Sequence, residues 1–253
     1  MTNILLIIIA IYLSIGVYLY ITQRSHLYFP TKAVSHNHDT IQISNGGETI
    51  EVIVVNPGQK KALLYFGGNA EVVADGAEVF ESRLIDHTTY LVEYRGYGHS
   101  TGTPTQTGIV SDGLKIYDII SPKHEQISLF GRSIGTGVAM QVASQRVVSQ
   151  MALITPYDSI TALAKKRYPI YPMEWLLKDK YDSFSLAPHI VADTIILIAS
   201  DDTLVPKEHA YRLESAFAPE LVSAIEIADS THSNIADTQQ YTELLDEFFH
   251  KGE

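Results

Sequence analysis

A serine between two glycines, at a predicted strand-to-helix turn, is the pattern in this sequence with the clearest chemistry. The pentapeptide Gly-Arg-Ser-Ile-Gly at 131–135 follows an apolar run at 127–130 and precedes a helical pattern at 138–146. This order is that of a nucleophile elbow, a sharp turn that lifts the serine above the end of a sheet. The flanking glycines suit it because strand and helix would cross almost in contact. The pattern predicts that Ser133 is a nucleophile; a glycine-rich turn with a capping serine is the alternative.

A general base and a carboxylate would activate such a serine, and two later loops offer them. His232 follows the last predicted strand and precedes the last predicted helix, a setting that the other histidines lack. Asp201 and Asp202 follow the apolar strand at 194–199. The order Ser, Asp, His along the chain is the one found when the serine stands on an elbow of this kind. The structural alternative is that Asp201 or Asp202 only begins the helix expected near Pro206, so the identity of the acid stays open at this point.

Backbone N–H groups near the serine would stabilise the negative charge of a tetrahedral intermediate. Gly-Gly-Asn-Ala at 67–70 follows the strand predicted at 62–66, and glycines let the backbone approach a ligand closely. We expect the amides of Asn69 and Ile134 to form this oxyanion hole. The structural alternative is a glycine turn with Asn69 as a helix N-cap.

Other polar residues receive structural interpretations. In the loop 94–100, Arg95 is expected to tie loops together through its guanidinium, and His99 is assigned no chemistry. His36 and His38 are a weak candidate metal pair in the segment that precedes the sheet. The chain has no cysteine, which removes disulfides and thiolate metal sites. We predict neither a metal nor an organic cofactor.

The elements that must position these residues alternate between strand and helix. Short apolar strands between amphipathic helices favour a mostly parallel sheet with helices on both faces. After a hairpin at 40–44 and 49–55, strands are predicted at 62–66, 89–93, 127–130, 151–155, 194–199 and 224–228. Helices are predicted near 70–84, 108–120, 135–146, 207–217 and 238–249.

The first residues form a separate apolar segment. Ile4 to Thr22 carries no charge and would span roughly 28 Å as a helix, close to the thickness of a bilayer core. We expect an uncleaved transmembrane anchor, with a signal peptide or a buried core helix as alternatives. Arg24 and Lys32 follow the segment and no Lys or Arg precedes it, which favours a catalytic domain on the cytoplasmic side.

The composition limits the partners. The chain of 253 residues is long enough for one domain with a large core. Its formal net charge of −11 makes nucleic acid an unfavourable partner, because like charges repel. The expected partners are a small or lipid-like acyl substrate and the bilayer that would hold the N-terminal helix. The oligomeric state is not predicted.

Taken together, these motifs resemble the α/β-hydrolase superfamily, and more narrowly its membrane-anchored, short-lidded members related to the serine aminopeptidase-like group. The resemblance covers about residues 25–250 and rests on the motifs at 27–30, 68–70, 94–98, 131–135 and 202–206 and on His232. It implies the α/β-hydrolase fold and a triad of Ser133, Asp202 and His232. Asp201 ranks second as the acid, and Asp158, after the strand that follows the elbow, ranks third. Many relatives have histidine where this chain has Gly67.

The expected organisation is therefore an anchor at 4–22, a connector at 23–39 and a hydrolase domain at 40–253. Residues 157–190 are too few for a large lid and should form a short cap, whose aromatic residues suggest an apolar acyl-binding wall. The predicted function is that of a membrane-anchored serine hydrolase acting on an ester, thioester or amide. The alternative is a catalytically silent binding or scaffold protein with the same fold.

Overall fold

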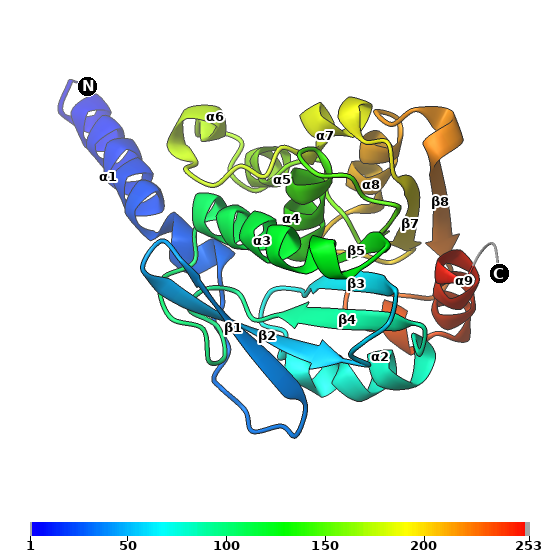
Figure 1. The fold of residues 1–253 in the computed structure, drawn as a ribbon. Coiled ribbons are helices and arrows are strands. Elements are labelled where there is room, and N and C mark those ends of the chain that lie inside the picture. Colours follow the sequence, from blue (N-terminus) through cyan, green and yellow to red (C-terminus); the bar gives the residue numbers. More distant parts are fainter. Residues whose placement is uncertain (1, 251–253) are drawn as a thin grey trace.

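Eight strands form a single sheet in the part of the chain that the structure, a computed structural model, describes, which is residues 2–250 (Figure 1). Along the sheet the order is β1-β2-β4-β3-β5-β6-β7-β8. β2 runs antiparallel to β1 and β4, and the remaining neighbours are parallel. The strands are β1 (Asp39–Asn45), β2 (Glu48–Val55), β3 (Lys61–Phe66), β4 (His87–Val92), β5 (Gln126–Arg132), β6 (Gln150–Ile154), β7 (Asp193–Ala199) and β8 (Val222–Ile227). The predicted mostly parallel sheet and its hairpin are confirmed; residues 251–253 of the expected domain lie outside the described residues.

Helices cover both faces of the sheet, as predicted (Figure 1). On one face α3, α4 and α8 contribute Ile116, Val138 and Leu213 to the larger core cluster. On the other face α2 and α9 contribute Ala77 and Phe248 to a second cluster. These helices are α2 (Ala77–Arg83), α3 (Gln106–Ile120), α4 (Ile134–Ala143), α8 (Lys207–Glu214) and α9 (Gln239–Phe249). Helices on both faces explain why all six residues of β4 are buried, rather than every second one.

The helix predicted at 70–84 begins later than expected. A 3-10 turn, η1 (Val73–Gly76), leads directly into α2, and residues 67–72 form a loop. Ala70 has a φ of 60°, a left-handed conformation that is incompatible with a right-handed helix. Residues 67–72 therefore form an irregular loop after β3 instead of the first turn of a helix.

The N-terminal helix α1 (Thr2–Leu27) projects from the body of the domain (Figure 1). An 18-residue window within Asn3–Leu27 has a mean hydropathy of 2.6, and the helix is long and apolar enough to cross a membrane. The most apolar part is not buried in the described structure, so the alternative of a buried core helix is wrong. The span predicted at 4–22 lies inside this helix.

The region between β6 and β7 consists of short helices and loops. It contains α5 (Ile160–Arg167), α6 (Met173–Leu176) and α7 (Ser183–Leu186), followed by the 3-10 turn η3 (Ala187–His189). Figure 1 shows α6 on the side of the domain from which α1 emerges. The segment expected as a short cap thus lies beside the N-terminal helix.

Candidate active site

The turn between β5 and α4 places Ser133 in a strained conformation. Its φ of 51° and ψ of −117° are rare for a residue other than glycine. A Cβ atom added to Gly131 would lie 2.6 Å from the Gly135 carbonyl oxygen, and one added to Gly135 would lie 2.0 Å from that of Phe66. Both distances are below any normal contact, so the expected need for small residues here is confirmed. The turn holds the serine hydroxyl at the end of the sheet.

A chain of hydrogen bonds connects Ser133, His232 and Asp202. The Ser133 Oγ lies 2.9 Å from His232 Nε2, and His232 Nδ1 lies 2.7 Å from Asp202 Oδ2. With its proton on Nδ1, the imidazole donates to the carboxylate and accepts from the serine hydroxyl. The His232 and Asp202 side chains are 14% and 2% exposed, so the carboxylate is shielded while the ring stays accessible.

The rest of the Asp202 carboxylate is fixed by the backbone. The amides of Leu204 and Val205 donate to its Oδ1 at 2.9 and 2.7 Å. Neither of the other candidate acids reaches His232: Asp201 is exposed, and Asp158 pairs with His209 and Arg212. Of the three candidate acids, Asp202 is the one whose carboxylate bonds His232 in the described structure.

The loop after β3 brings Asn69 to the same edge of the sheet, but its side chain caps no helix. The Asn69 Oδ1 accepts from the Phe29 amide and the Tyr97 hydroxyl, each at 2.9 Å, and its Nδ2 donates to the Leu27 carbonyl at 2.7 Å. The N-cap alternative is thus wrong. Ile134 is the first residue of α4, whose leading N–H groups have no acceptor within the helix. The side chain of Asn69 ties the end of α1 to this loop.

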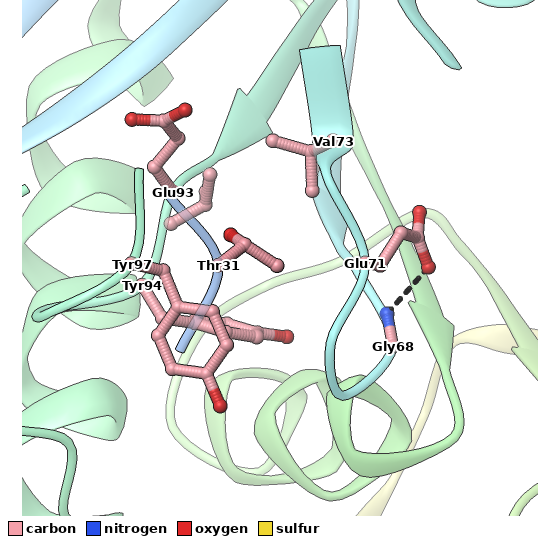
Figure 2. A pocket seen from close by; sticks show the side chains of 8 residues that line it. Thr31, Gly68, Glu71, Val73, Glu93, Tyr94 and Tyr97 are labelled. Atoms are coloured by element: carbon pink, nitrogen blue, oxygen red, sulfur yellow. Dashed lines mark hydrogen bonds between the residues drawn. The ribbon is translucent and has the colours of Figure 1, made fainter. Parts of the chain in front are cut away.

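Glu71 and Arg132 brace the loops around the serine, and the sequence analysis missed both. The Gly68 amide donates to Glu71 Oε2 at 2.7 Å, as Figure 2 shows, and the Tyr65 hydroxyl donates to Oε1. Arg132 bonds Glu71 at 3.4 Å and the Ser233 carbonyl, beside His232, at 3.2 Å. The motif position of Arg132, one residue before the serine, was the available signal.

Buried tyrosines surround these loops as neutral donors. Burial raises the pKa of Tyr94 well above its ordinary value, and its hydroxyl donates to the Gly67 carbonyl at 2.8 Å. Burial also raises the pKa of Tyr97 to about 12. Both phenols line a small cavity between Gly68 and Glu93 (Figure 2). Because they stay protonated near neutral pH, they hold the loop without adding charge.

The loop after β4 ties elements together, as its sequence predicted. Arg95 donates to both carboxylate oxygens of the buried Asp112 in α3, at 2.7 and 2.6 Å. His99, which received no chemistry, lies 3.1 Å from Glu51 Oε1.

The cap contacts α1 directly. The rings of Tyr12 and Tyr171 stack with centroids 4.7 Å apart, and the Tyr12 hydroxyl donates to the Ile170 carbonyl. Near the C-terminal end of α1, the Arg24 guanidinium pairs with the buried Asp179 carboxylate at 2.7 Å. Trp175 and Ile170 remain 86% and 69% exposed. The cap thus presents apolar side chains beside an apolar helix.

Sequence comparison identifies curated relatives of moderate similarity. The chain is 29% identical over 166 residues to the uncharacterized protein Rv2307c of Mycobacterium tuberculosis, matching 64% of this chain and 59% of that protein. It is 30% identical over 180 residues to the lysophosphatidylserine lipase ABHD12 of Macaca fascicularis, matching 62% of this chain and 45% of that protein. The chain therefore spans about half the length of the curated relatives it matches. No family model matches it.

Solved structures share the fold at low sequence identity. MGS-M2, an alpha/beta hydrolase enzyme from a deep-sea metagenome library, has a TM-score of 0.69 at 13% identity, with 84% of this chain and 98% of that chain covered. Est1E from Butyrivibrio proteoclasticus has a TM-score of 0.68 at 16% identity, covering 83% and 97%. The fold is that of the α/β hydrolases.

Proposed function

Because the chain belongs to the α/β-hydrolase superfamily, we propose that it is a serine hydrolase, held at a membrane by α1, that cleaves an ester bond of a lipid-like substrate. Thioesters and amides follow the same chemistry, since the triad does not select the leaving group. The observation that carries the proposal is the continuous hydrogen-bond chain from Ser133 through His232 to Asp202.

The mechanism is acyl transfer to water in two steps. Ser133 Oγ attacks the substrate carbonyl while His232 Nε2 takes its proton, and Asp202 holds the ring and stabilises the imidazolium. The amides of Asn69 and Ile134 bind the oxyanion. His232 then protonates the leaving group, and a water molecule hydrolyses the acyl-enzyme by the same route in reverse.

The position of α1 supports a substrate that comes from the bilayer. The helix ends at Leu27, and the next residues bond directly to Asn69 beside the proposed oxyanion hole. A lipid headgroup at the membrane surface would therefore lie near Ser133. The lipase named among the curated relatives acts on a lysophospholipid, which agrees with this class of substrate.

The position of the cap along α1 also supports a substrate that comes from the bilayer. Tyr12 lies within the proposed membrane span, about 12 Å along the helix from Tyr20. Tyr171 stacks on Tyr12, and the Lys178 ammonium lies 4.2 Å from the centre of the Tyr20 ring. If Tyr20 marks the interface, Lys178 lies at headgroup level and Trp175 enters the acyl region. We propose that the exposed apolar side chains of the cap then guide the acyl chain from the bilayer toward the serine.

The test compares a membrane substrate with a soluble one. The full chain in detergent is assayed on p-nitrophenyl butyrate, and after reconstitution into vesicles on lysophospholipids that differ in headgroup. Trp175→Ala should lower turnover of the vesicle substrate at least fivefold and leave butyrate hydrolysis nearly unchanged. Val147→Ala is the matched control, because Val147 is 82% exposed but follows α4 rather than lying in the cap. Equal vesicle activity of both variants would contradict delivery through the cap, and no esterase activity in the wild type would contradict the proposed reaction.

A further inference from the structure

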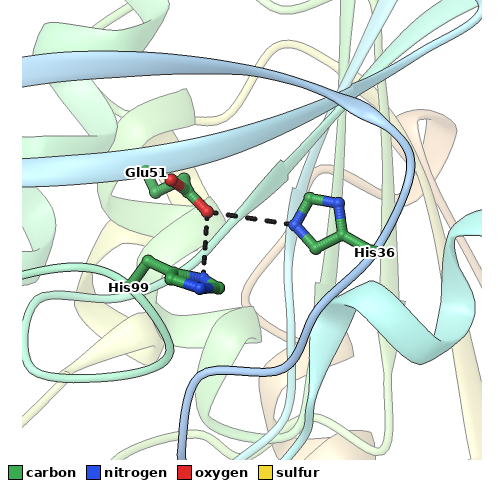
Figure 3. A group of neighbouring side chains, drawn as sticks. All are labelled: His36, Glu51 and His99. Atoms are coloured by element: carbon green, nitrogen blue, oxygen red, sulfur yellow. Dashed lines mark ion pairs between the residues drawn. The ribbon is translucent and has the colours of Figure 1, made fainter.

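Two histidines and a glutamate from three separate segments meet beside β2 (Figure 3), a strand that β4 and β3 separate from β5, which leads to Ser133. His36 comes from the segment before β1, Glu51 from β2 and His99 from the loop after β4. One ligand atom of each lies within 4.8 Å of those of the other two. Their side chains point toward one another, and Glu51 lies between the two rings (Figure 3).

A second carboxylate adjoins this group. β2 and β4 are antiparallel with Val52 opposite Val92, and the Glu93 amide donates to the Glu51 carbonyl. Glu51 in β2 and Glu93, directly after β4, are therefore in facing positions, and they are only 8% and 4% exposed. Like charges in facing positions destabilise a sheet, and burial increases that cost.

The described residues supply no permanent cation to offset these charges. In residues 2–250, the ion pairs of Glu51 are with His36 at 3.9 Å and His99 at 3.1 Å, and that of Glu93 is with His99 at 3.6 Å. Histidine is largely neutral at pH 7. The Glu93 carboxylate also accepts the backbone N–H of His99. Among the described residues, the side chains that form ion pairs with these two buried carboxylates are imidazoles, and a bound metal cation would balance their charge.

We propose that His36, Glu51 and His99 bind one divalent transition metal ion, with Glu93 close enough to serve as a fourth ligand. Nitrogen ligands favour Zn²⁺ or a similar ion over Ca²⁺ and Mg²⁺, which take oxygen ligands. Ligand atoms at about 2.1 Å from a tetrahedral Zn²⁺ lie roughly 3.4 Å apart. The Glu51–His99 and Glu51–His36 distances of 3.1 and 3.9 Å lie on either side of that value, so small side-chain rotations suffice.

The backbone around the group is already organised. Gly98 has a φ of 52°, and a Cβ atom added there would lie 2.2 Å from the Glu93 carboxylate. The Gly98 amide donates to the Thr31 carbonyl, and the backbones of Lys32 and Gly98 form an isolated parallel β-bridge. These contacts hold the segment that carries His36 against the loop that carries His99. His99 is 41% exposed, which gives a metal ion access from solvent.

Such an ion would fasten the connector between α1 and the sheet. The proposed metal site lies apart from the proposed catalytic residues, although Glu93 and Gly68 line the same small cavity (Figure 2). The inference does not depend on the proposed hydrolase activity. A protein inactive on every ester would still bind the metal.

The experiment measures Zn²⁺ binding to the full chain, purified in detergent without a polyhistidine tag and stripped with a chelator. We expect about one equivalent of Zn²⁺ by isothermal titration calorimetry, and a thermal midpoint that rises by about 5 to 10 °C when free Zn²⁺ is 100-fold above Kd. Co²⁺ in the same site should give the visible absorption bands of a low-symmetry, nitrogen-containing site.

Variants separate this site from general histidine binding. His36→Ala, His99→Ala and Glu51→Gln should each weaken binding at least tenfold and remove the thermal shift. His189→Ala is the matched control, because His189 is exposed in η3, far from the group along the chain, and should bind as the wild type does. Thermal midpoints in chelator check that the variants fold. Equal binding by His36→Ala, His99→Ala and His189→Ala, or no stoichiometric binding by the folded wild type, would overturn the proposal.

Discussion

Replacement of Asp202 by asparagine tests the proposed mechanism through the histidine tautomer. The Oδ1 position of Asp202 accepts two backbone N–H groups, from Leu204 and Val205, so the oxygen of an asparagine must occupy it. The amide NH₂ would then stand where Oδ2 lies now, 2.7 Å from His232 Nδ1. Since the NH₂ only donates, Nδ1 must accept, and the ring proton moves to Nε2. A protonated Nε2 cannot take the proton of Ser133.

The expected loss is large in activity and small in stability. The wrong tautomer should lower kcat/KM for p-nitrophenyl butyrate by about 10³- to 10⁴-fold, or roughly 4 to 5.5 kcal/mol of transition-state stabilisation. The thermal midpoint should move little, because the hydrogen bonds around residue 202 are retained. Initial rates at pH 7.5 and a thermal melt measure both quantities.

Asp158→Asn is the matched control for this experiment. Asp158 is also buried and also bonds a histidine Nδ1, that of His209, at 2.8 Å, but it does not contact His232. Its replacement should change kcat/KM less than tenfold. A loss in Asp158→Asn equal to that in Asp202→Asn, or a loss below tenfold in Asp202→Asn, would refute the reasoning.

Three further substitutions test the surroundings of the site. Gly135→Ala places a methyl group 2.0 Å from the Phe66 carbonyl oxygen and should lower the free energy of unfolding by about 3 kcal/mol. The thermal midpoint should then fall by at least about 6 °C, and an unchanged midpoint would contradict the close packing. Asn69→Ala removes three side-chain hydrogen bonds but keeps the backbone amide, so the free energy of unfolding should fall by about 1 to 3 kcal/mol while kcat falls less than tenfold. A large loss of kcat with unchanged stability would instead give the side chain a catalytic role. Arg132→Met frees the loops that carry Gly68 and Ser233 and should lower kcat about tenfold at similar KM in steady-state kinetics, whereas wild-type kinetics would show that this brace is dispensable.

Much of the fold was predictable because its signals are local. The apolar runs at β3 to β8 are short and bounded by turns, and the hairpin β1-β2 closes at Gly46-Gly47, where both residues have positive φ. The start of α2 was not predictable from periodicity alone. Ala70 adopts a left-handed conformation because the loop after β3 is shaped by distant contacts, among them those of Asn69 with Leu27 and Phe29.

The candidate site also contains residues that local sequence patterns indicate and residues that only the fold brings together. The elbow, the Asp202 loop and His232 are marked by their places after strands, and parallel strands bring those loops to one edge. The brace of Glu71 and Arg132 and the group of His36, Glu51 and His99 join residues far apart in the chain. Their partners are set by strand order and register, which the sequence does not display. His36 was singled out with His38, whose ring lies 6.0 Å from it, and the structure also places His36 with Glu51 and His99, which the sequence did not indicate.

Labelling with a fluorophosphonate probe shows whether Ser133 is an activated nucleophile. The wild-type chain and Ser133→Ala are treated side by side in detergent after their thermal midpoints are shown to agree. We expect rapid labelling of the wild type and none of the variant, with the modified peptide containing Ser133. Equal labelling of both proteins, or no labelling of the folded wild type, would contradict a nucleophilic role of Ser133.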